Sequence, residues 1–372
     1  MRIQRVETYR AAVPLHTPFK TALRTVTVAE TLVVKITSED GYIGWGEAPP
    51  THVITGDSLA SIDFAVNGIF KPLMEGASLE GRERLFEKIN KSIVGNTSAK
   101  AAVDMAIYDL ISQQANLSLA SFLGGYTNTL ETDYTVSVGE PAHMAEAAVE
   151  FADRGFTTLK IKVGKGDPAA DIKRLQAIRE RTGNQVKLRL DANQGWLAGE
   201  AVRTIRTMED LGLDIELVEQ PVRAGDIAGL KQVTTNTETP IMADESVFSP
   251  KDARIVLEQR AADLINIKLM KGGGIHQALK IAKLADVYGV ECMVGSMIET
   301  KIGITAAAHF AASQPNVTRY DFDAPLMLTG DLAAGGGIIY KDNVIHVPDE
   351  AGLGIRSIDW KYVEKCREEV KG

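Results

Sequence analysis

The chain has 372 residues, of which 45% are hydrophobic and 24% are charged, and its formal net charge is −8 at pH 7. This composition is typical of a folded protein and excludes a disordered or fibrous chain. The acidic balance argues against a general nucleic-acid or membrane surface, so we expect a small-molecule partner. Only Cys292 and Cys366 occur, and no apolar run has the length of a membrane span, which favours a cytoplasmic protein without disulfides.

The first 50 residues alternate between polar and apolar side chains, as strands do. We predict strands over 2–13 and 31–48, the second with a turn at Asp40 and Gly41, and a polar loop over 16–25 between them. Three stretches with helical spacing of apolar residues follow, at 57–74, 79–94 and 98–115. The first two complete an α+β lobe, whereas the third looks like part of the region that follows.

From residue 132 to residue 324, eight strand-like runs alternate with helices. Polar residues at the ends of these runs recur every 24 to 29 residues, at Lys162, Asp191, Glu219, Asp244, Lys268, Ser296 and Asp321. That interval is the length of one strand, one helix and two loops, which predicts a (β/α) barrel with its chemistry at the C-terminal ends of the strands. The tail from about residue 330 is Gly-rich and then short-stranded, and we expect it to return to the first lobe.

Asp191, Glu219 and Asp244 fall at the ends of three consecutive predicted strands. Three carboxylates that converge on one barrel mouth repel each other unless a cation neutralises them. Oxygen ligands without nearby Cys or His point to a hard ion, so we expect Mg²⁺, with Mn²⁺ as an alternative. Asn193 and Glu245 are candidates for supporting these ligands from the adjoining loops, although both are also natural loop or cap residues.

Lys160 and Lys162 lie two residues apart in a strand, so both side chains point to the same face. Their mutual repulsion would lower a lysine pKa from about 10.4 toward roughly 7–8, the range useful for a general base. Lys268 follows four strands later and therefore faces Lys162 across the barrel axis. The alternative for these lysines is a structural salt bridge with the carboxylates. Lys271, on the next loop, is expected to be solvated.

A base that faces a divalent metal suits removal of the proton next to a carboxylate. The metal stabilises the doubly charged enediolate that would otherwise be inaccessible. A lysine base combined with Mg²⁺ is the arrangement already described for the enolase superfamily. Return of a proton from the opposite lysine inverts the stereocentre. Return from the original face, or loss of a leaving group, gives isomerisation or elimination instead.

The chain resembles the muconate-lactonising subgroup of the enolase superfamily over essentially its full length. The shared motifs are K-x-K at 160–162, DANQGW at 191–196, EQP at 219–221, ADES at 243–246 and NIK at 266–268. Within the subgroup it is most similar to dipeptide epimerases of the L-Ala-D/L-Glu type. The segments that indicate this are FKTALRTV at 19–26, WGEAPP at 45–50, ITGDS at 54–58, TLETDYTVSV at 129–138, VGSMIETKIGITAAAHFAAS at 294–313 and RYDFDAPLML at 319–328.

The fold implied by the resemblance is a modified (β/α)7β barrel of the TIM type with an α+β capping domain built from both ends of the chain. For this sequence it implies a capping domain over 1–125, whose last helix at about 98–115 is expected to contact the barrel. The barrel then covers 126–328, and the C-terminal segment 329–372 returns to the capping domain.

The resemblance also implies a role for each site residue. Lys162 and Lys268 would be the acid/base catalysts, and Lys160 would tune Lys162 and contact substrate. Asp191, Glu219 and Asp244 would bind Mg²⁺. Asp321 and Asp323 match the D-x-D that holds the α-ammonium group of a dipeptide, and Arg24 matches the arginine that receives a glutamate side chain. Further contacts, each equally explicable as packing, are Thr135, Ser296, Met297, Ile298 and Ile54.

The function implied is Mg²⁺-dependent epimerisation of L-Ala-D-Glu and L-Ala-L-Glu, in the recycling of cell-wall peptides. Its rivals are a dipeptide epimerase of different side-chain preference, or a cycloisomerase, o-succinylbenzoate synthase or N-acylamino acid racemase, whose substrates lack a free ammonium. An acid-sugar dehydratase would need a histidine near the seventh strand, where VGSMIE has none. A catalytically silent barrel is disfavoured by the intact lysines. We expect a homo-oligomer, as for many barrel enzymes.

Overall fold

Eight parallel strands form a barrel in this computed structural model, which describes residues 1–365. They lie side by side in chain order, and a parallel bridge between Thr132 and Tyr320 joins the first to the last. The strands are β5 (Tyr134–Val136), β6 (Thr158–Lys162), β7 (Lys187–Asp191), β8 (Ile215–Glu219), β9 (Ile241–Ala243), β10 (Leu264–Ile267), β11 (Glu291–Val294) and β12 (Val317–Tyr320). The predicted barrel is confirmed. Cys292 is a buried free thiol, and Cys366 lies outside the described residues.

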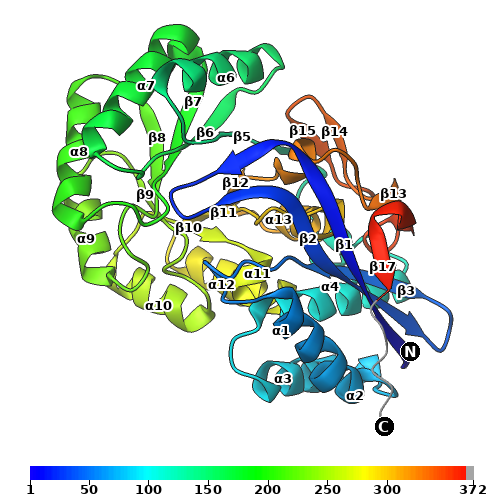
Figure 1. Cartoon of the computed structure of the whole chain (residues 1–372). Helices are drawn as coiled ribbons and strands as arrows, with labels where there is room; N and C mark the ends of the chain where they lie inside the picture. The colour runs from blue at the N-terminus through cyan, green and yellow to red at the C-terminus, as the bar shows by residue number, and fades with distance from the viewer. Residues whose placement is uncertain (366–372) are drawn as a thin grey trace.

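Helices surround the barrel on the outside, as Figure 1 shows. They are α6 (Pro141–Asp153), α7 (Pro168–Thr182), α8 (Ala198–Asp210), α9 (Ile227–Asn236), α10 (Pro250–Gln259), α11 (Leu269–Gly272), α12 (Ile275–Val287) and α13 (Lys301–Ala312). Their starts are encoded locally: Asp167 and Ser249 cap α7 and α10, each followed by a proline in the first turn. Within residues 1–365 no helix combines the length and apolarity that a membrane crossing requires.

Strand alternation decides which groups face the interior of the barrel. Leu217, Met242 and Leu264 form a small apolar cluster with Met293, separate from the main core. Residues two positions further along a strand share its face, so Glu219 and Asp244 follow Leu217 and Met242 on the interior side. The apolar cluster therefore closes the barrel below the polar groups and leaves those groups at the C-terminal mouth.

A four-stranded antiparallel sheet covers this mouth. Its order is β17-β1-β2-β3, with β1 (Ile3–Lys20), β2 (Thr25–Ser38), β3 (Ile43–Ala48) and β17 (Val363–Lys365). The C-terminal strand β17 lies beside β1 (Figure 1), as expected of a tail that returns to the first lobe. The predicted loop over 16–25 is wrong, because β1 and β2 continue through most of it and leave only residues 21–24 at the hairpin end.

Helices between β3 and the barrel complete the capping domain. Helical structure runs from α1 (Leu59–Asp63) through a π-helical turn (64–70) to α2 (Lys71–Met74), and continues in α3 (Arg82–Ser92), α4 (Thr97–Gln114) and α5 (Leu119–Phe122). Helix α4 packs directly on β3, where a Cβ at Gly46 would overlap the backbone of Ala102. The carboxylate of Asp104 on α4 accepts from the backbone N–H of Ile275, at the start of α12. Helix α4 thus contacts both the capping sheet and the barrel helices. The division of the chain into domains near residues 125 and 328 stays a prediction.

Short strands connect the barrel to the C-terminal segment. Strand β15 (Val344–His346) pairs with both β14 (Ile339–Lys341) and β4 (Thr129–Glu131), and β13 (Ala333–Gly336) pairs with β16 (Ile355–Ile358). β4 immediately precedes the first barrel strand. The short-stranded tail expected from the sequence is therefore present, and part of it packs at the start of the barrel.

Candidate active site

A cavity lies between the barrel mouth and the end of the β1–β2 hairpin. Nearly all predicted site residues line it. From the barrel come Thr135, Lys160, Lys162, Asn193, Asp244, Glu245, Lys268, Ser296, Met297, Ile298, Asp321 and Asp323. From the capping domain come Phe19, Thr21, Leu23, Arg24, Val53 and Ile54. Segments 16–27 and 51–58 therefore both contribute to its cover.

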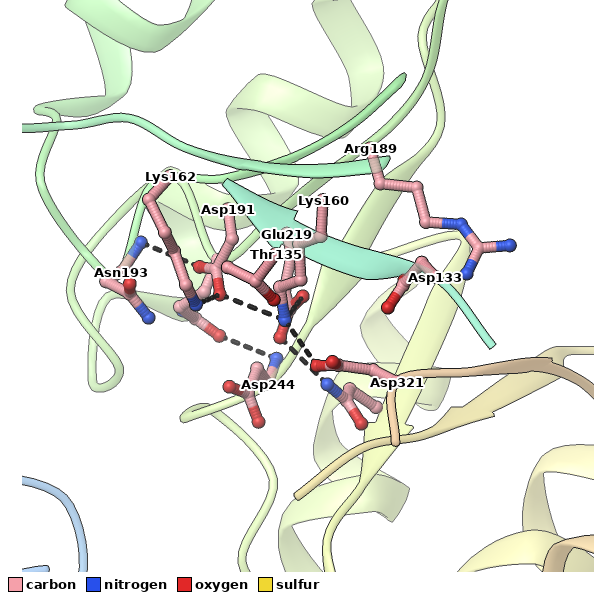
Figure 2. A network of polar contacts seen from close by, with 12 residues as sticks. Asp133, Thr135, Lys160, Lys162, Arg189, Asp191, Asn193, Glu219, Asp244 and Asp321 are labelled. Carbon is pink, nitrogen blue, oxygen red and sulfur yellow. Dashed lines mark hydrogen bonds and ion pairs between the residues drawn. The ribbon is translucent and has the colours of Figure 1, made fainter. Parts of the chain in front are cut away.

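Three buried carboxylates lie at the bottom of the mouth, on adjacent strands. Asp191 ends β7, Glu219 ends β8, and Asp244 directly follows β9. At most 1% of any of the three residues is exposed. Figure 2 shows Asp191 and Glu219 close to the ammonium group of Lys160, with Asp244 next to them in the site.

Strained backbone follows two of these carboxylates. Asn193 and Gln194, after Asp191, have φ of 42° and 69°, and Gln220, after Glu219, has φ of 39°. Non-glycine residues adopt this region at a cost, and such residues concentrate at functional sites. The side chain of Gln220 accepts from the backbone N–H of Asp244 at 2.9 Å, so it ties two of the acidic loops together. Hydrogen bonding between the acidic loops therefore helps to hold this strained backbone in place.

Lys160 is the centre of the ion-pair network. Its Nζ lies 3.1 Å from Asp191, 2.7 Å from Glu219 and 2.8 Å from Asp321. Burial opposes its charge, but these carboxylates outweigh burial and raise the pKa of Lys160 well above its usual value. Figure 2 shows Lys160 between these partners.

Lys162 and Lys268 lie on β6 and directly after β10, four strands apart in an eight-stranded barrel. The Nζ of Lys162 is 2.6 Å from Asp191, and that of Lys268 is 2.8 Å from Asp244. Burial again opposes the charge of Lys268, but Asp244 and Glu219 raise its pKa. A lowered lysine pKa is therefore not found for Lys160 or Lys268, because carboxylates rather than other lysines are their nearest charges.

The mouth contains more carboxyl groups than ammonium groups. Its buried ammonium groups belong to Lys160, Lys162, Lys268 and Lys271, and its buried carboxyl groups to Asp191, Glu219, Asp244, Glu245, Asp321 and Asp323. Six carboxyl groups thus face four ammonium groups. Burial and neighbouring acids raise the pKa of Glu219 to about 7 and that of Glu245 to about 8.

An oxygen-only donor set with this excess of carboxyl groups fits a divalent hard cation. Both carboxylate oxygens of Glu245 and the Oδ1 of Asn193 have no hydrogen-bond partner among residues 1–365, although they are buried. As the side chains stand, no three acidic, His or Cys side chains in these residues surround a common point. Lysines instead lie against one oxygen of Asp191, against Glu219 and against both oxygens of Asp244, so the ligands would have to turn from the lysines toward the ion.

Asp321 and Asp323 follow β12 and both line the cavity. They lie after the strand rather than on it, and Asp323 precedes a 3-10 turn at 324–327. The Oδ2 of Asp323 accepts from the backbone N–H of Thr135 at 2.6 Å. Burial and Asp321 raise the pKa of Asp323 to about 7. Among residues 1–365, the one lysine within salt-bridge distance of these two acids is Lys160, which pairs with Asp321.

Arg24 lies at the hairpin end, where its backbone exchanges hydrogen bonds with Thr21. Its side chain lines the cavity, and no acidic side chain in residues 1–365 lies within salt-bridge distance of it. Burial lowers the pKa of Arg24. A partly buried guanidinium without an anionic partner suits a carboxylate of a bound molecule.

The rest of the lining is largely apolar. Met297 and Ile298 lie on the loop after β11, opposite Leu23, Val53 and Ile54 from the capping domain. Sequence reasoning missed Phe19, Thr21, Leu23 and Val53, although FKTALRT contains the first three. The ring of Phe19 lies 5.8 Å from the Nζ of Lys162, which marks it as part of the mouth.

The predicted solvent exposure of Lys271 is wrong. This lysine was expected to be solvated, but it is only 1% exposed. Its Nζ lies 2.5 Å from the Oδ1 of Asp244 and donates to the backbone carbonyls of Asp244 and Asn266. Asn266 in turn donates to Glu219 at 2.8 Å. The short helix α11 turns Lys271 back under the strand ends, so it supports the acidic groups instead of meeting solvent.

Two family models match the capping and barrel regions of the chain. Residues 3–124 match the family described as mandelate racemase / muconate lactonizing enzyme, N-terminal domain, and residues 143–361 match the family described as enolase C-terminal domain-like. The chain belongs to the mandelate racemase/muconate lactonizing enzyme family of the enolase superfamily.

Particular relatives narrow the class of enzyme. The chain is 61% identical to the L-Ala-D/L-Glu epimerase of Bacillus subtilis (strain 168), over 95% of this chain and 97% of that one. A solved substrate complex of the Bacillus subtilis L-Ala-D/L-Glu epimerase has a TM-score of 0.96 at 61% identity, covering 96% of this chain and all of that chain. The Enterococcus faecalis V583 dipeptide epimerase, in complex with Mg and L-Leu-L-Tyr, has a TM-score of 0.92 at 45% identity, covering 95% and 99%. These relatives support an isomerase.

Proposed function

We propose that this enzyme epimerises dipeptides at the α-carbon of their second residue by a 1,1-proton transfer. The observation that carries the proposal is the placement of Lys162 and Lys268 on opposite sides of one cavity, with the acidic cluster between them. A substrate carbon held there presents one face to each lysine amino group. The lysine on one face takes the α-proton as a neutral amine, and the lysine on the other face returns a proton as an ammonium group, with Lys162 serving one face and Lys268 the other.

Asp191, Glu219 and Asp244 are the residues that would hold Mg²⁺, and Mn²⁺ is the alternative ion. When bound, the metal supplies positive charge to the substrate carboxylate as its α-proton leaves. The relative with L-Leu-L-Tyr was solved with Mg, which supports the choice of ion. Asn193 and Glu245 border the ligands and would support them. Lys160, which contacts two of the ligands, would tune Lys162 through Asp191, which both lysines contact.

The remaining groups orient the dipeptide. Asp321 and Asp323 bind its α-ammonium group, because a cation under a cover needs anionic partners. Arg24 binds the side-chain carboxylate of the second residue. Thr135 and Ser296 contact the substrate from the first and seventh strands, and Met297, Ile298 and Ile54 form an apolar wall around the small first residue. The hairpin end excludes water from the lysines.

The substrates that fit this arrangement best are L-Ala-D-Glu and L-Ala-L-Glu, and the setting we propose is recycling of cell-wall peptides. The 61% identical relative, named L-Ala-D/L-Glu epimerase, supports this choice. We also propose a cytoplasmic location, in line with the acidic composition and two cysteines, and assembly as a homo-oligomer.

Incubation of the purified enzyme with L-Ala-L-Glu and Mg²⁺ tests the proposal. Chiral chromatography should show L-Ala-D-Glu accumulating until the two epimers are in comparable amounts. EDTA should stop the conversion, and added Mg²⁺ should restore it. A protein that leaves both Ala-Glu epimers unchanged but converts N-acylated or cyclic acids would belong to one of the rival activities of the subgroup.

A dipeptide epimerase of different side-chain preference is the second candidate. Leu23, Val53 and Ile54 bring apolar side chains to the cavity beside Arg24, which suits an apolar second residue. The relative solved with L-Leu-L-Tyr shows a bound dipeptide of that kind. Conversion of L-Ala-L-Leu at a higher kcat/KM than L-Ala-L-Glu would favour this candidate.

A further inference from the structure

Two buried glutamates outside the proposed catalytic groups connect the capping sheet to the wall of the cavity. Glu47 lies on β3, and Glu299 lies in the loop between β11 and α13. Glu47 is fully buried, and Glu299 is 2% exposed. No lysine or arginine in residues 1–365 lies within salt-bridge distance of either carboxyl group. Burial of a carboxyl group without a cationic partner costs free energy, so other contacts must stabilise these two groups.

Their hydrogen bonds converge on one short loop. The Oε1 of Glu299 accepts from the backbone N–H of Met297 at 2.9 Å. The Oε1 of Glu47 accepts from the backbone N–H of Thr300 at 2.8 Å, and its Oε2 accepts from the Thr300 hydroxyl. Glu299 thus holds the loop from within, whereas Glu47 holds its far end from the capping sheet.

Both carboxyl groups lie close to Gly303. A Cβ at this position would overlap the Oε2 of Glu299 and come within 3.2 Å of the carboxyl carbon of Glu47. Gly303 lies in the first turn of α13, where glycine has no conformational advantage. Its absent side chain is what makes room for the two glutamates.

Burial and the neighbouring charges favour protonation of one carboxyl group of the Glu47–Glu299 pair near neutral pH. Burial and Glu47 raise the pKa of Glu299 to about 8, although Lys268 opposes the shift. Burial also raises the pKa of Glu47 to about 7, with Asp331 adding to the shift and the bonds from Thr300 opposing it. The two carboxyl groups therefore favour keeping one proton between them near neutral pH, and the Oε1 of Glu299 accepts from the backbone N–H of Met297.

We propose that Glu299 and Glu47 are positioning residues that set the apolar wall of the substrate cavity. They do not line the cavity themselves, but Met297 and Ile298 do. Ile54, on the same cavity, follows β3 in the chain, so Glu47 anchors the capping segment and the barrel loop to each other. The inference concerns substrate fit and rests on the proposed dipeptide epimerase function.

The first test needs no substrate. Hydrogen–deuterium exchange of the full chain should show at least about tenfold faster exchange over residues 296–300 in Glu299→Ala than in the wild type. Glu299→Gln keeps an acceptor for Met297 and should exchange like the wild type. Asp109→Asn is the matched control, because Asp109 is a buried acid that accepts from Trp45 and Leu353 and does not line the cavity. Unchanged exchange over 296–300 in Glu299→Ala would overturn the positioning role.

The second test separates binding from chemistry. Glu299→Ala should raise KM for L-Ala-L-Glu about tenfold and leave kcat within about threefold, because the lysines are untouched. Glu299→Gln should restore KM. Faster exchange with unchanged KM would overturn the link to substrate. A wild type without epimerase activity would refute the proposed function, while the exchange measurement would still decide the positioning role. If Glu299→Ala does not fold, Glu299→Asp, which withdraws the carboxyl group by one methylene, replaces it with the same expectations.

Discussion

Arg24 allows the substrate preference to be tested by one substitution, Arg24→Met, which keeps an unbranched side chain and removes the charge. The guanidinium lines the cavity and pairs with no acidic side chain in residues 1–365. Burial lowers its pKa, so its charge is already disfavoured when no anion is bound. A substrate carboxylate would supply the missing partner.

The magnitude follows from the kind of bond that is lost. A hydrogen bond to a charged group contributes about 1.5–3 kcal/mol, which corresponds to roughly 10- to 150-fold. We expect Arg24→Met to lower kcat/KM for L-Ala-L-Glu by this factor. The kcat/KM for the neutral dipeptides L-Ala-L-Gln and L-Ala-L-Leu should stay within about threefold.

A matched control separates a direct contact from the general field of the hairpin. Lys20→Met removes one positive charge from the same hairpin, at an exposed residue that does not line the cavity. It should leave the preference for the acidic dipeptide unchanged. An Arg24→Met enzyme that loses activity equally on acidic and neutral dipeptides would refute the role of Arg24 in specificity.

Three further predictions concern the lysines and the buried acids. Lys162→Ala and Lys268→Ala should each lower epimerisation by about 10²–10⁴-fold, while each variant still exchanges the α-proton of one epimer; inversion at the wild-type rate would exclude two bases. Lys271→Met removes the lysine partner of the Oδ1 of Asp244 and of two buried backbone carbonyls, and should cost about 3–5 kcal/mol of stability in urea unfolding. Unchanged stability would contradict this support. The folded pKa of Glu299, about 8, exceeds its ordinary 4.5, so the free energy of unfolding should fall as pH rises between these values. Urea titrations at pH 5 and pH 8 should show a smaller fall for Glu299→Gln, and equal falls would disprove the buried proton.

The barrel and the position of its polar groups followed from the sequence because both are local properties of the chain. A regular spacing of strand and helix predicts which ends meet, and a residue such as Asp191 at the end of an alternating run has its face decided by that alternation. Asp321 was placed in the mouth for the same reason, although it lies just after the strand that was expected to carry it.

The errors arose where contacts between distant segments decide the outcome. Lys271 looks like a loop residue in sequence, and only the turn of α11 beneath Asp244 buries it. The polar stretch 16–25 reads as a loop, but pairing with β2 extends β1 through Lys20. Repulsion between Lys160 and Lys162 was expected to lower a lysine pKa, but three carboxylates raise the pKa of Lys160, and the sequence does not give their distances.

The link between Glu47 and Glu299 could not be read from the chain for a related reason. The two residues are far apart in sequence, and each belongs to a motif, WGEAPP or VGSMIE, that also has a plain packing explanation. Only the fold brings both carboxyl groups over Gly303. A single sequence shows which residues are unusual, whereas the folded structure shows which of them are in contact.

Proton NMR in deuterated water tests the central claim most directly. The enzyme with Mg²⁺ is given L-Ala-L-Glu and a small panel of other L-Ala-L-Xaa dipeptides, and the α-proton of the second residue is followed. The account predicts that this signal disappears while the diastereomer grows in, fastest for Glu. Retention of the α-proton in every dipeptide of the panel would contradict proton transfer by Lys162 and Lys268.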